Sequence, residues 1–187
     1  MARNYYYLAG SLPMAVFGEK LPMTPEALDE TVARLADPAD HALFRKVALR
    51  PTAETLALPG AAGKFAEWEN ALRNAWLEFR RKERPDAGDF KRNYPDFFAE
   101  IGPGLAQAAN AANPLDAEMI LDRMRWNRLD ELEAGHAFDF DRVCICKLKL
   151  LILAKYACRT PEAGQAALDG IVGRLVPDEK SSTENQK

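Results

Sequence analysis

Four short polar residues, each followed directly by proline, mark where helices begin in this chain. The pairs are Thr24-Pro25, Asp37-Pro38, Asn113-Pro114 and Thr160-Pro161. A Thr, Asp or Asn side chain accepts a hydrogen bond from a free N–H of the first turn, and proline lacks an N–H that would have stayed unpaired there. Apolar residues at helical spacing follow each pair, so the sequence predicts an almost wholly helical chain.

The predicted helices cover 3–12, 24–36, 38–50, 61–83, 95–101, 103–112, 114–134, 139–158 and 161–175. The segment 61–83 has the clearest pattern, because its large apolar residues fall within an arc of about 100°, the width of a core-facing stripe. Two apolar stripes on 114–134 predict a central helix. Strand remains an alternative for 3–12. The segment 139–158 also alternates like a strand in part, but its length favours a buried helix.

We therefore expect an all-α fold, a multi-helix bundle that is either one body or two helical lobes. A chain of 187 residues suits a single domain, here 1–176. The break at Pro85-Asp86-Ala87-Gly88 places the candidate lobe boundary at 85–92. The polar end of the chain, 177–187, is predicted to be a disordered tail.

Composition excludes several classes of protein. The net charge of −3 argues against a general nucleic-acid binder, which needs a basic excess. The most apolar run, from Val143 to Ala154, is interrupted by Lys147 and Lys149 and falls short of the roughly 20 residues of a membrane span. The first residues lack the apolar core of a signal peptide, so a cytoplasmic location is expected. The three cysteines are then expected to be reduced and buried.

No catalytic, cofactor or metal constellation is expected from the motifs, and the chain is predicted not to be an enzyme. The segment from Gly60 to Lys64 lacks the spacing and the Ser or Thr of a phosphate-binding loop, so we interpret it as a helix start. Glu133 and His136 have the spacing of half a di-iron site. A helical-bundle metalloenzyme with a Glu133/His136 site is therefore kept as an alternative function.

Three groups of residues are candidates for binding a partner protein. Three adjacent tyrosines cannot all face one core, and arginine and tryptophan are common anchors of interfaces. Basic residues also gather at the end of the helix predicted over 61–83. The candidates are Tyr5, Tyr6, Tyr7, Arg80, Arg81, Arg84, Arg125 and Trp126. For the arginines of this helix, Arg125 among them, pairing within the chain is the favoured interpretation, with Asp122, Asp130, Glu131 or Glu133 as the partner.

Four segments carry a resemblance to a known family. They are Asn4-Tyr5-Tyr6-Tyr7-Leu8-Ala9-Gly10-Ser11-Leu12-Pro13, Asn113-Pro114-Leu115-Asp116-Ala117-Glu118, Leu129-Asp130-Glu131-Leu132-Glu133 with Phe138-Asp139, and the leucine-rich stretch from Lys147 to Lys155. With these segments the chain resembles an uncharacterised bacterial family encoded in V-type (A/V-type) ATPase operons. That family is similar in general plan to the helical C/d subunit of rotary ATPases, an adaptor between the central shaft and the membrane ring.

The resemblance implies a non-catalytic component or assembly factor of a V-type ATPase. Its partners would be stalk or rotor subunits, and it would meet the membrane only through the ATPase complex. A helical interaction module unrelated to ATPases is the further alternative. Genes for ATPase subunits on either side of this one would favour the first interpretation over the second.

Overall fold

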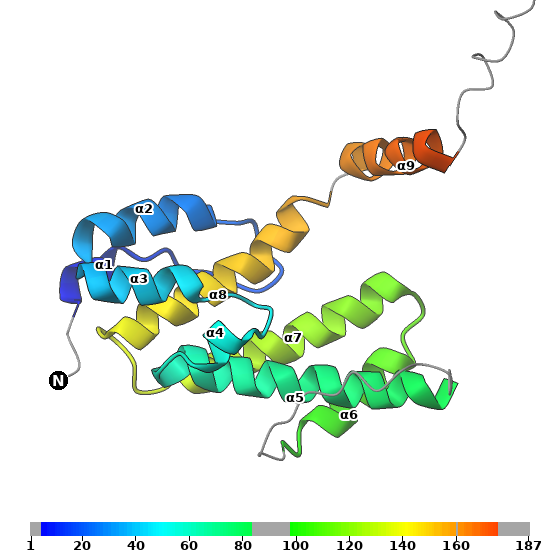
Figure 1. Cartoon of the computed structure of the whole chain (residues 1–187), viewed down its shortest axis with the longest axis horizontal. Helices are drawn as coiled ribbons and strands as arrows, with labels where there is room; N and C mark the ends of the chain where they lie inside the picture. Colours follow the sequence, from blue (N-terminus) through cyan, green and yellow to red (C-terminus); the bar gives the residue numbers. More distant parts are fainter. Residues whose placement is uncertain (1–4, 84–97, 160, 176–187) are drawn as a thin grey trace, which may run out of the picture. The chain divides into compact units, whose positions relative to one another are not determined.

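All regular structure in the described part of the chain is helical, which confirms the predicted all-α multi-helix bundle. The computed structural model describes residues 5–83, 98–159 and 161–175. Over these residues there are nine helices and no strand (Figure 1). They are α1 (Tyr6–Ser11), α2 (Pro25–Leu35), α3 (Pro38–Lys46), α4 (Ala53–Leu56), α5 (Gly60–Glu83), α6 (Ile101–Ala109), α7 (Pro114–Glu133), α8 (Phe140–Ala157) and α9 (Pro161–Leu175).

Three of the four predicted helix caps are formed as expected, and each is followed by proline in the first turn. Thr24 Oγ1 accepts from the Ala27 N–H at 3.2 Å, Asp37 Oδ1 from Ala39 at 2.9 Å, and Asn113 Oδ1 from Asp116 at 2.9 Å. Thr160 lies outside the described residues. The short helix α4 has a reciprocal cap that the proline pattern did not reveal. There Thr52 Oγ1 accepts from the Thr55 N–H at 3.2 Å, and the Thr52 N–H donates to Thr55 Oγ1 at 2.7 Å.

Two predictions about helices are wrong. The helix expected over 38–50 ends at Lys46, and Val47 is already extended. The pair of helices expected at 95–101 and 103–112 is replaced, over the residues described, by α6 alone. Pro103 does not separate two helices, because it lies in the first turn of α6, where its missing N–H has no partner to lose.

The chain divides by its internal contacts into two units, Met1–Ala154 and Lys155–Lys187. The first unit contains α1 to α7 and most of α8, and the second contains α9. Within the first unit α5 contacts both α6 and α7, which follow it in the chain. The candidate lobe boundary at 85–92 and the predicted tail at 177–187 both lie outside the described residues.

Helix α8 forms the core of the first unit. Its buried residues include the four consecutive positions from Val143 to Cys146, which point in all directions around a helix because each residue turns about 100°. Figure 1 shows α8 between α2 and α3 on one side and α5 and α7 on the other. The contacts agree: Lys147 Nζ donates to the Phe44 carbonyl of α3 at 2.8 Å, and Lys149 Nζ lies 2.6 Å from Asp130 of α7. The predicted buried helix is confirmed.

Helix α7 is less central than predicted. Its second half is buried at Trp126 and Leu129, but Leu115 and Met119 in its first half are exposed. The predicted two apolar stripes therefore do not both meet neighbours along the whole helix.

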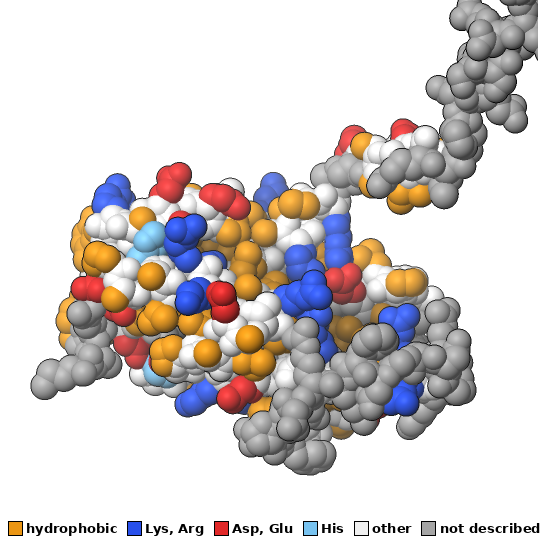
Figure 2. Space-filling view, viewed as in Figure 1, with side chains coloured by type: hydrophobic (Ala, Val, Ile, Leu, Met, Phe, Trp, Pro, Cys, Tyr) orange, Lys and Arg blue, Asp and Glu red, His pale blue; other side chains and the backbone are white. Residues whose placement is uncertain are grey.

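None of the helices described is long and apolar enough to cross a bilayer. Figure 2 shows acidic and basic side chains interspersed over the visible face, in keeping with the small net charge.

The stripe predicted on α5 is confirmed in its first half, where Phe65, Trp68 and Leu72 are buried. The start of this helix is also tightly fitted. A Cβ added at Gly63 would lie 2.0 Å from the backbone oxygen of Leu58, whereas a Cβ at Gly102 in α6 would meet nothing within 4 Å. Only glycine therefore fits at position 63.

Gly63→Ala should lower the free energy of unfolding by about 2–3 kcal/mol, because the added methyl overlaps backbone that cannot move aside as a side chain can. The matched change Gly102→Ala should be neutral or stabilising by up to about 1 kcal/mol, from the higher helix propensity of alanine. Urea unfolding followed by circular dichroism measures both. Equal stability of the two variants would contradict the close approach at Gly63.

Candidate functional site

The three adjacent tyrosines at the start of the described chain have different environments. The hydroxyl group of Tyr5 donates to the Asp40 carboxylate and accepts from the Asp37 N–H at 3.3 Å. Both of these partners lie at the beginning of α3. Tyr5 therefore holds the N-terminal segment against α3, and this contact gives the side chain a structural role.

Tyr6 and Tyr7 are directed outward, as the argument from three adjacent rings required. Their side chains are 63% and 78% exposed. The Tyr6 ring packs on Phe138, itself exposed, with ring centroids 5.1 Å apart. We call Tyr6, Tyr7 and Phe138 the aromatic patch. It combines an element from the beginning of the chain with the turn that precedes α8.

The predicted basic cluster is only partly described. Arg80 is exposed in the last turns of α5 and Arg81 is half-buried, whereas Arg84 lies outside the described residues. Arg80 also lines a cavity on α5, together with Arg50 and Arg73. The basic character at this end of α5 therefore comes from more of the chain than the local run of arginines.

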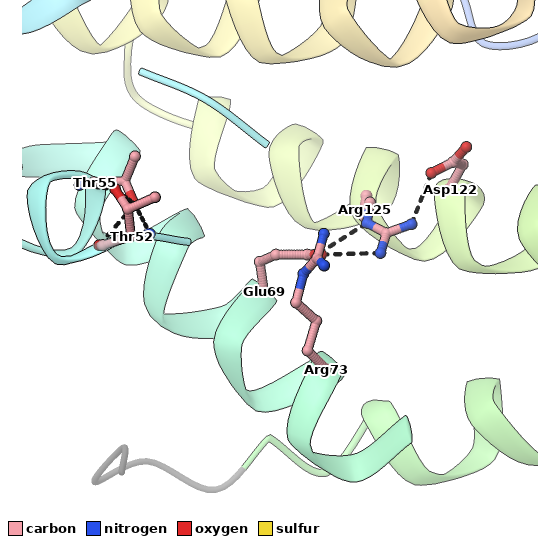
Figure 3. A network of polar contacts seen from close by, with 6 residues as sticks. All are labelled: Thr52, Thr55, Glu69, Arg73, Asp122 and Arg125. Carbon is pink, nitrogen blue, oxygen red and sulfur yellow. Dashed lines mark hydrogen bonds and ion pairs between the residues drawn. The ribbon is translucent and has the colours of Figure 1, made fainter. Parts of the chain in front are cut away.

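Arg125 and Trp126, two of the predicted interface residues, lie inside the fold. Arg125 donates from Nε to Glu69 Oε2 at 2.8 Å, from Nη2 to Glu69 Oε1 at 2.9 Å, and from Nη1 to Asp122 Oδ1 at 2.8 Å (Figure 3). The contact with Glu69 is a two-bonded guanidinium–carboxylate pair that joins α7 to α5. Asp122 is one of the four acidic residues that the sequence offered as partners within the chain.

The charges of this network balance. Glu69 and Asp122 are fully buried, and Arg125 is 11% exposed. Arg73 supplies a second cation, with its Nε 2.7 Å from Glu69 Oε1. Burial on its own would lower the pKa of Arg125, but the nearby Glu69 and Asp122 carboxylates raise it above its ordinary value. The guanidinium thus stays charged, and together with Arg73 it compensates the two buried carboxylates.

Trp126 is 5% exposed and is packed on two sides. The Phe17 ring meets it edge-on at 5.4 Å, and Lys149 Nζ lies 5.3 Å from its ring. Neither Trp126 nor Arg125 offers a surface to a partner, so their predicted interface role is wrong. The physical reason is that both side chains point toward α5 and α8 rather than to solvent.

Glu133 and His136 do not form the predicted half of a di-iron site. Helix α7 ends at Glu133, and Gly135 has a φ of +89°, so the helical register that the motif requires is lost. The Glu133 carboxylate pairs instead with Lys149 and Arg142 of α8. Glu133 therefore forms part of the contact between α7 and α8.

His136 joins a different set of side chains. In the described residues, one ligand atom each of His136, Asp139 and Asp141 lie within 4.8 Å of one another. Both carboxylates already have structural partners: Asp139 Oδ1 accepts from the Arg142 N–H at 3.1 Å, and Asp141 Oδ1 accepts from the Ala61 N–H at 2.9 Å. His136 Nδ1 is 2.5 Å from Asp139 Oδ2. This arrangement fixes the beginning of α8.

The interpretation of Gly60 to Lys64 as a helix start is confirmed, since α5 begins at Gly60. Gly60 has a φ of +67°, and a Cβ there would lie 2.2 Å from Asp141 Oδ1. The Asp141 carboxylate thus occupies the N-terminal end of α5, where a negative charge is favoured by the helix dipole. A group from within the chain fills the position that a bound phosphate would take.

Two of the three cysteines are buried as expected. Cys144 and Cys146 lie in the core on α8, whereas Cys158 is exposed beyond the end of that helix, so the prediction is wrong for Cys158. Burial raises the pKa of Cys146 to about 11, and burial, with a contribution from Asp141, raises the pKa of Cys144 as well. Both core thiols therefore stay protonated near neutral pH.

The cross-helix partner of Arg125 was missed from sequence. Glu69 lies four residues after Phe65 and three before Leu72, so it shares the buried stripe of α5. That position is the signal that could have identified it, because a carboxylate in such a stripe requires a cation from another element. The sequence alone does not say which cation.

No family model, curated protein or solved structure matches this chain. The resemblance to the ATPase-operon family consequently remains a prediction from the sequence. The contacts described above stand independently of it.

Arg125→Met should lower the free energy of unfolding by about 3–5 kcal/mol, because it leaves two buried carboxylates without their shared cation. Arg128→Met is the matched control. Its ion pair with Glu131 on the same helix is partly exposed, so its loss should cost about 1 kcal/mol or less. Urea unfolding of the two variants measures the loss of stability in each. Losses of similar size would contradict the structural role of the Arg125 network.

Alkylation should distinguish the three thiols. At pH 8 a group with a pKa of about 11 is only about one part in a thousand thiolate, and the thiolate is the reactive form. Iodoacetamide should therefore label Cys158 alone in the folded protein and all three cysteines in concentrated urea. Mass spectrometry of the digested protein measures this. Rapid labelling of Cys144 or Cys146 before unfolding would contradict their burial.

Proposed function

We propose that this protein is a helical, non-catalytic component or assembly factor of a V-type ATPase that binds stalk or rotor subunits. The resemblance of segments spread from Asn4 to Lys155 supports the ATPase assignment. The all-helical body supports an adaptor-like role, since exposed helix faces are common docking surfaces for other proteins. In this role the protein is cytoplasmic and meets the membrane only through the complex.

The aromatic patch is the observation that carries a binding role. Tyrosine and phenylalanine are enriched in the cores of protein interfaces, where a large ring contributes much contact area at small entropic cost. Here Tyr6 and Tyr7 expose most of their surface, and Tyr6 is already ordered against Phe138. The two tyrosines also fall in the first segment that resembles the ATPase-operon family. The patch is therefore the surface that we assign to the ATPase partner.

The other two interpretations of the sequence differ from this proposal in what they predict. A Glu133/His136 metalloenzyme receives no support from the geometry, because Glu133 is held by Lys149 and Arg142. A helical module unrelated to ATPases would use the same patch but would not accompany ATPase subunits. Purification from the native host, followed by mass spectrometry, separates this last alternative from the proposal.

Tagged protein purified from its native host should bring stalk or rotor subunits of the V-type ATPase with it. The double variant Tyr6→Ser, Tyr7→Ser should reduce this recovery by about tenfold or more, because it removes two aromatic side chains of the kind that dominate interface energies. Met14→Ser is the matched control, since Met14 is a highly exposed apolar residue outside the patch. Its recovery should equal that of the wild type.

Quantitative mass spectrometry of the purified material measures the recovery. Absence of ATPase subunits from the wild-type preparation would sink the proposed function. If the subunits are recovered equally with the double variant and with Met14→Ser, the function stands and its assignment to the aromatic patch fails.

A further inference from the structure

A cavity of about 280 Å³ opens beside the second half of α5. Its wall includes three arginines from two parts of the chain: Arg73 and Arg80 on α5, and Arg50 from the segment between α3 and α4. Asn70, Trp76 and Leu77 also line the cavity. None of the described residues that line it is acidic.

The positive charge of this cavity is only partly compensated. Arg73 uses its Nε for Glu69, but both Glu69 oxygens are also bound by Arg125. Arg50 and Arg80 are exposed and form no ion pair with any described residue. Two guanidinium groups thus remain available, together with the terminal nitrogens of Arg73. The positive charge of this cavity favours an anionic ligand.

Asn70 adds a second and independent indication of a ligand. Its side chain is 1% exposed, and its Oδ1 is buried without a hydrogen-bond partner among the described residues. An unpaired buried polar atom costs about 1–3 kcal/mol. A primary amide can rotate to present either its oxygen or its N–H groups to the cavity. When the oxygen faces the cavity, it can accept a hydrogen bond from an N–H of a ligand.

Trp76 and Leu77 give the cavity an apolar side. The Trp76 ring is half-buried and lies nearly parallel to Phe79, with centroids 5.9 Å apart and planes 7° apart. Stacking holds the indole in place, so it presents a fixed flat surface beside the arginines. The hydrocarbon part of an Asp or Glu side chain, or of its neighbour in a peptide, can pack against this surface.

We propose that this cavity binds an acidic side chain presented by an exposed peptide segment of a partner protein. The carboxylate meets Arg73 and Arg80, a backbone N–H of the segment meets Asn70, and Arg50 lies beside a further acidic residue. The inference rests on the proposed function only in taking a protein as the ligand.

The placement of the arginines favours a segment of a protein over a free metabolite. The cavity, at about 280 Å³, is close to the lower end of the range of about 300–1,000 Å³ that is usual for sites enclosing a small molecule. Arg50 and Arg80 are exposed and come from different segments of the chain, which suits contact with residues on either side of the inserted one.

Fluorescence anisotropy with a labelled peptide of alternating Glu and Ala tests the inference in the full chain. The same peptide with Gln in place of Glu is the matched probe. The Glu peptide should bind at least tenfold more tightly than the Gln peptide, and its affinity should fall as salt is raised, because surface charge interactions are screened.

Arg80→Glu should weaken binding of the Glu peptide by about tenfold or more, since it replaces an attraction with a repulsion in the cavity. Lys64→Glu makes the same change of charge at an exposed position of α5 outside the cavity, and it should alter the affinity less than about twofold. Asn70→Leu should weaken binding by about threefold or more while leaving the protein as stable as the wild type, or more so, because it removes an unpaired buried oxygen. Circular dichroism and urea unfolding of each variant verify folding.

Equal binding of the Glu and Gln peptides, no binding of either, or equal effects of Arg80→Glu and Lys64→Glu would each overturn the inference. The inference would also be overturned if inorganic phosphate, at the same concentration as the Glu peptide, displaced that peptide. The cavity would then be a site for small anions. Failure here while ATPase subunits still accompany the purified protein leaves the proposed function standing. Success here with no ATPase subunits leaves an acidic-peptide site on a protein of another role.

Discussion

The contact between α5 and α7 depends on one buried guanidinium. Glu69 and Asp122 are both removed from water, and neither could stay ionised in the interior without a cation at hydrogen-bond distance. Arg125 meets both: one bond reaches Asp122 on its own helix, and two parallel bonds reach Glu69 on α5, which constrains how α5 and α7 lie against each other. The apolar neighbours of α5 could tolerate small shifts along the helix, whereas this set of bonds could not. The network thus constrains the alignment of α5 with α7.

Helix α8 uses charge in a complementary way. Its middle is buried on all sides, yet Lys147 and Lys149 project from it toward α3 and α7. Each ammonium group reaches an oxygen of the neighbouring helix and also lies against an aromatic ring, Phe44 or Trp126. The two lysines that interrupt the apolar run therefore give a core helix defined orientations toward its neighbours, which leucines in their place would not specify.

What could be predicted from sequence was what is decided locally. Thr24, Asp37 and Asn113 act on N–H groups two or three residues away, so their caps followed from short patterns, and with them the all-helical fold. The prediction at Pro103 was wrong because proline is compatible both with the first turn of a helix and with a boundary between two helices. Arg125 and Trp126 have the chemistry of interface anchors, and only the placement of α5 and α8 shows that they are buried. The i,i+4 pair of Glu69 with Arg73 follows from spacing on one helix. The contact of Glu69 with Arg125, and the position of Arg50 beside α5, depend on other segments of the chain, which this spacing does not encode.

The carboxylate of Asp141 has a consequence for how the chain matures. It is 80 residues away from the Ala61 N–H that it binds. During synthesis α5 is made before Asp141. The Ala61 N–H in its first turn is therefore hydrogen-bonded to water until the Asp141 carboxylate can bind it. The first turn of α5 consequently acquires this hydrogen bond only after the beginning of α8 has been synthesised and has docked.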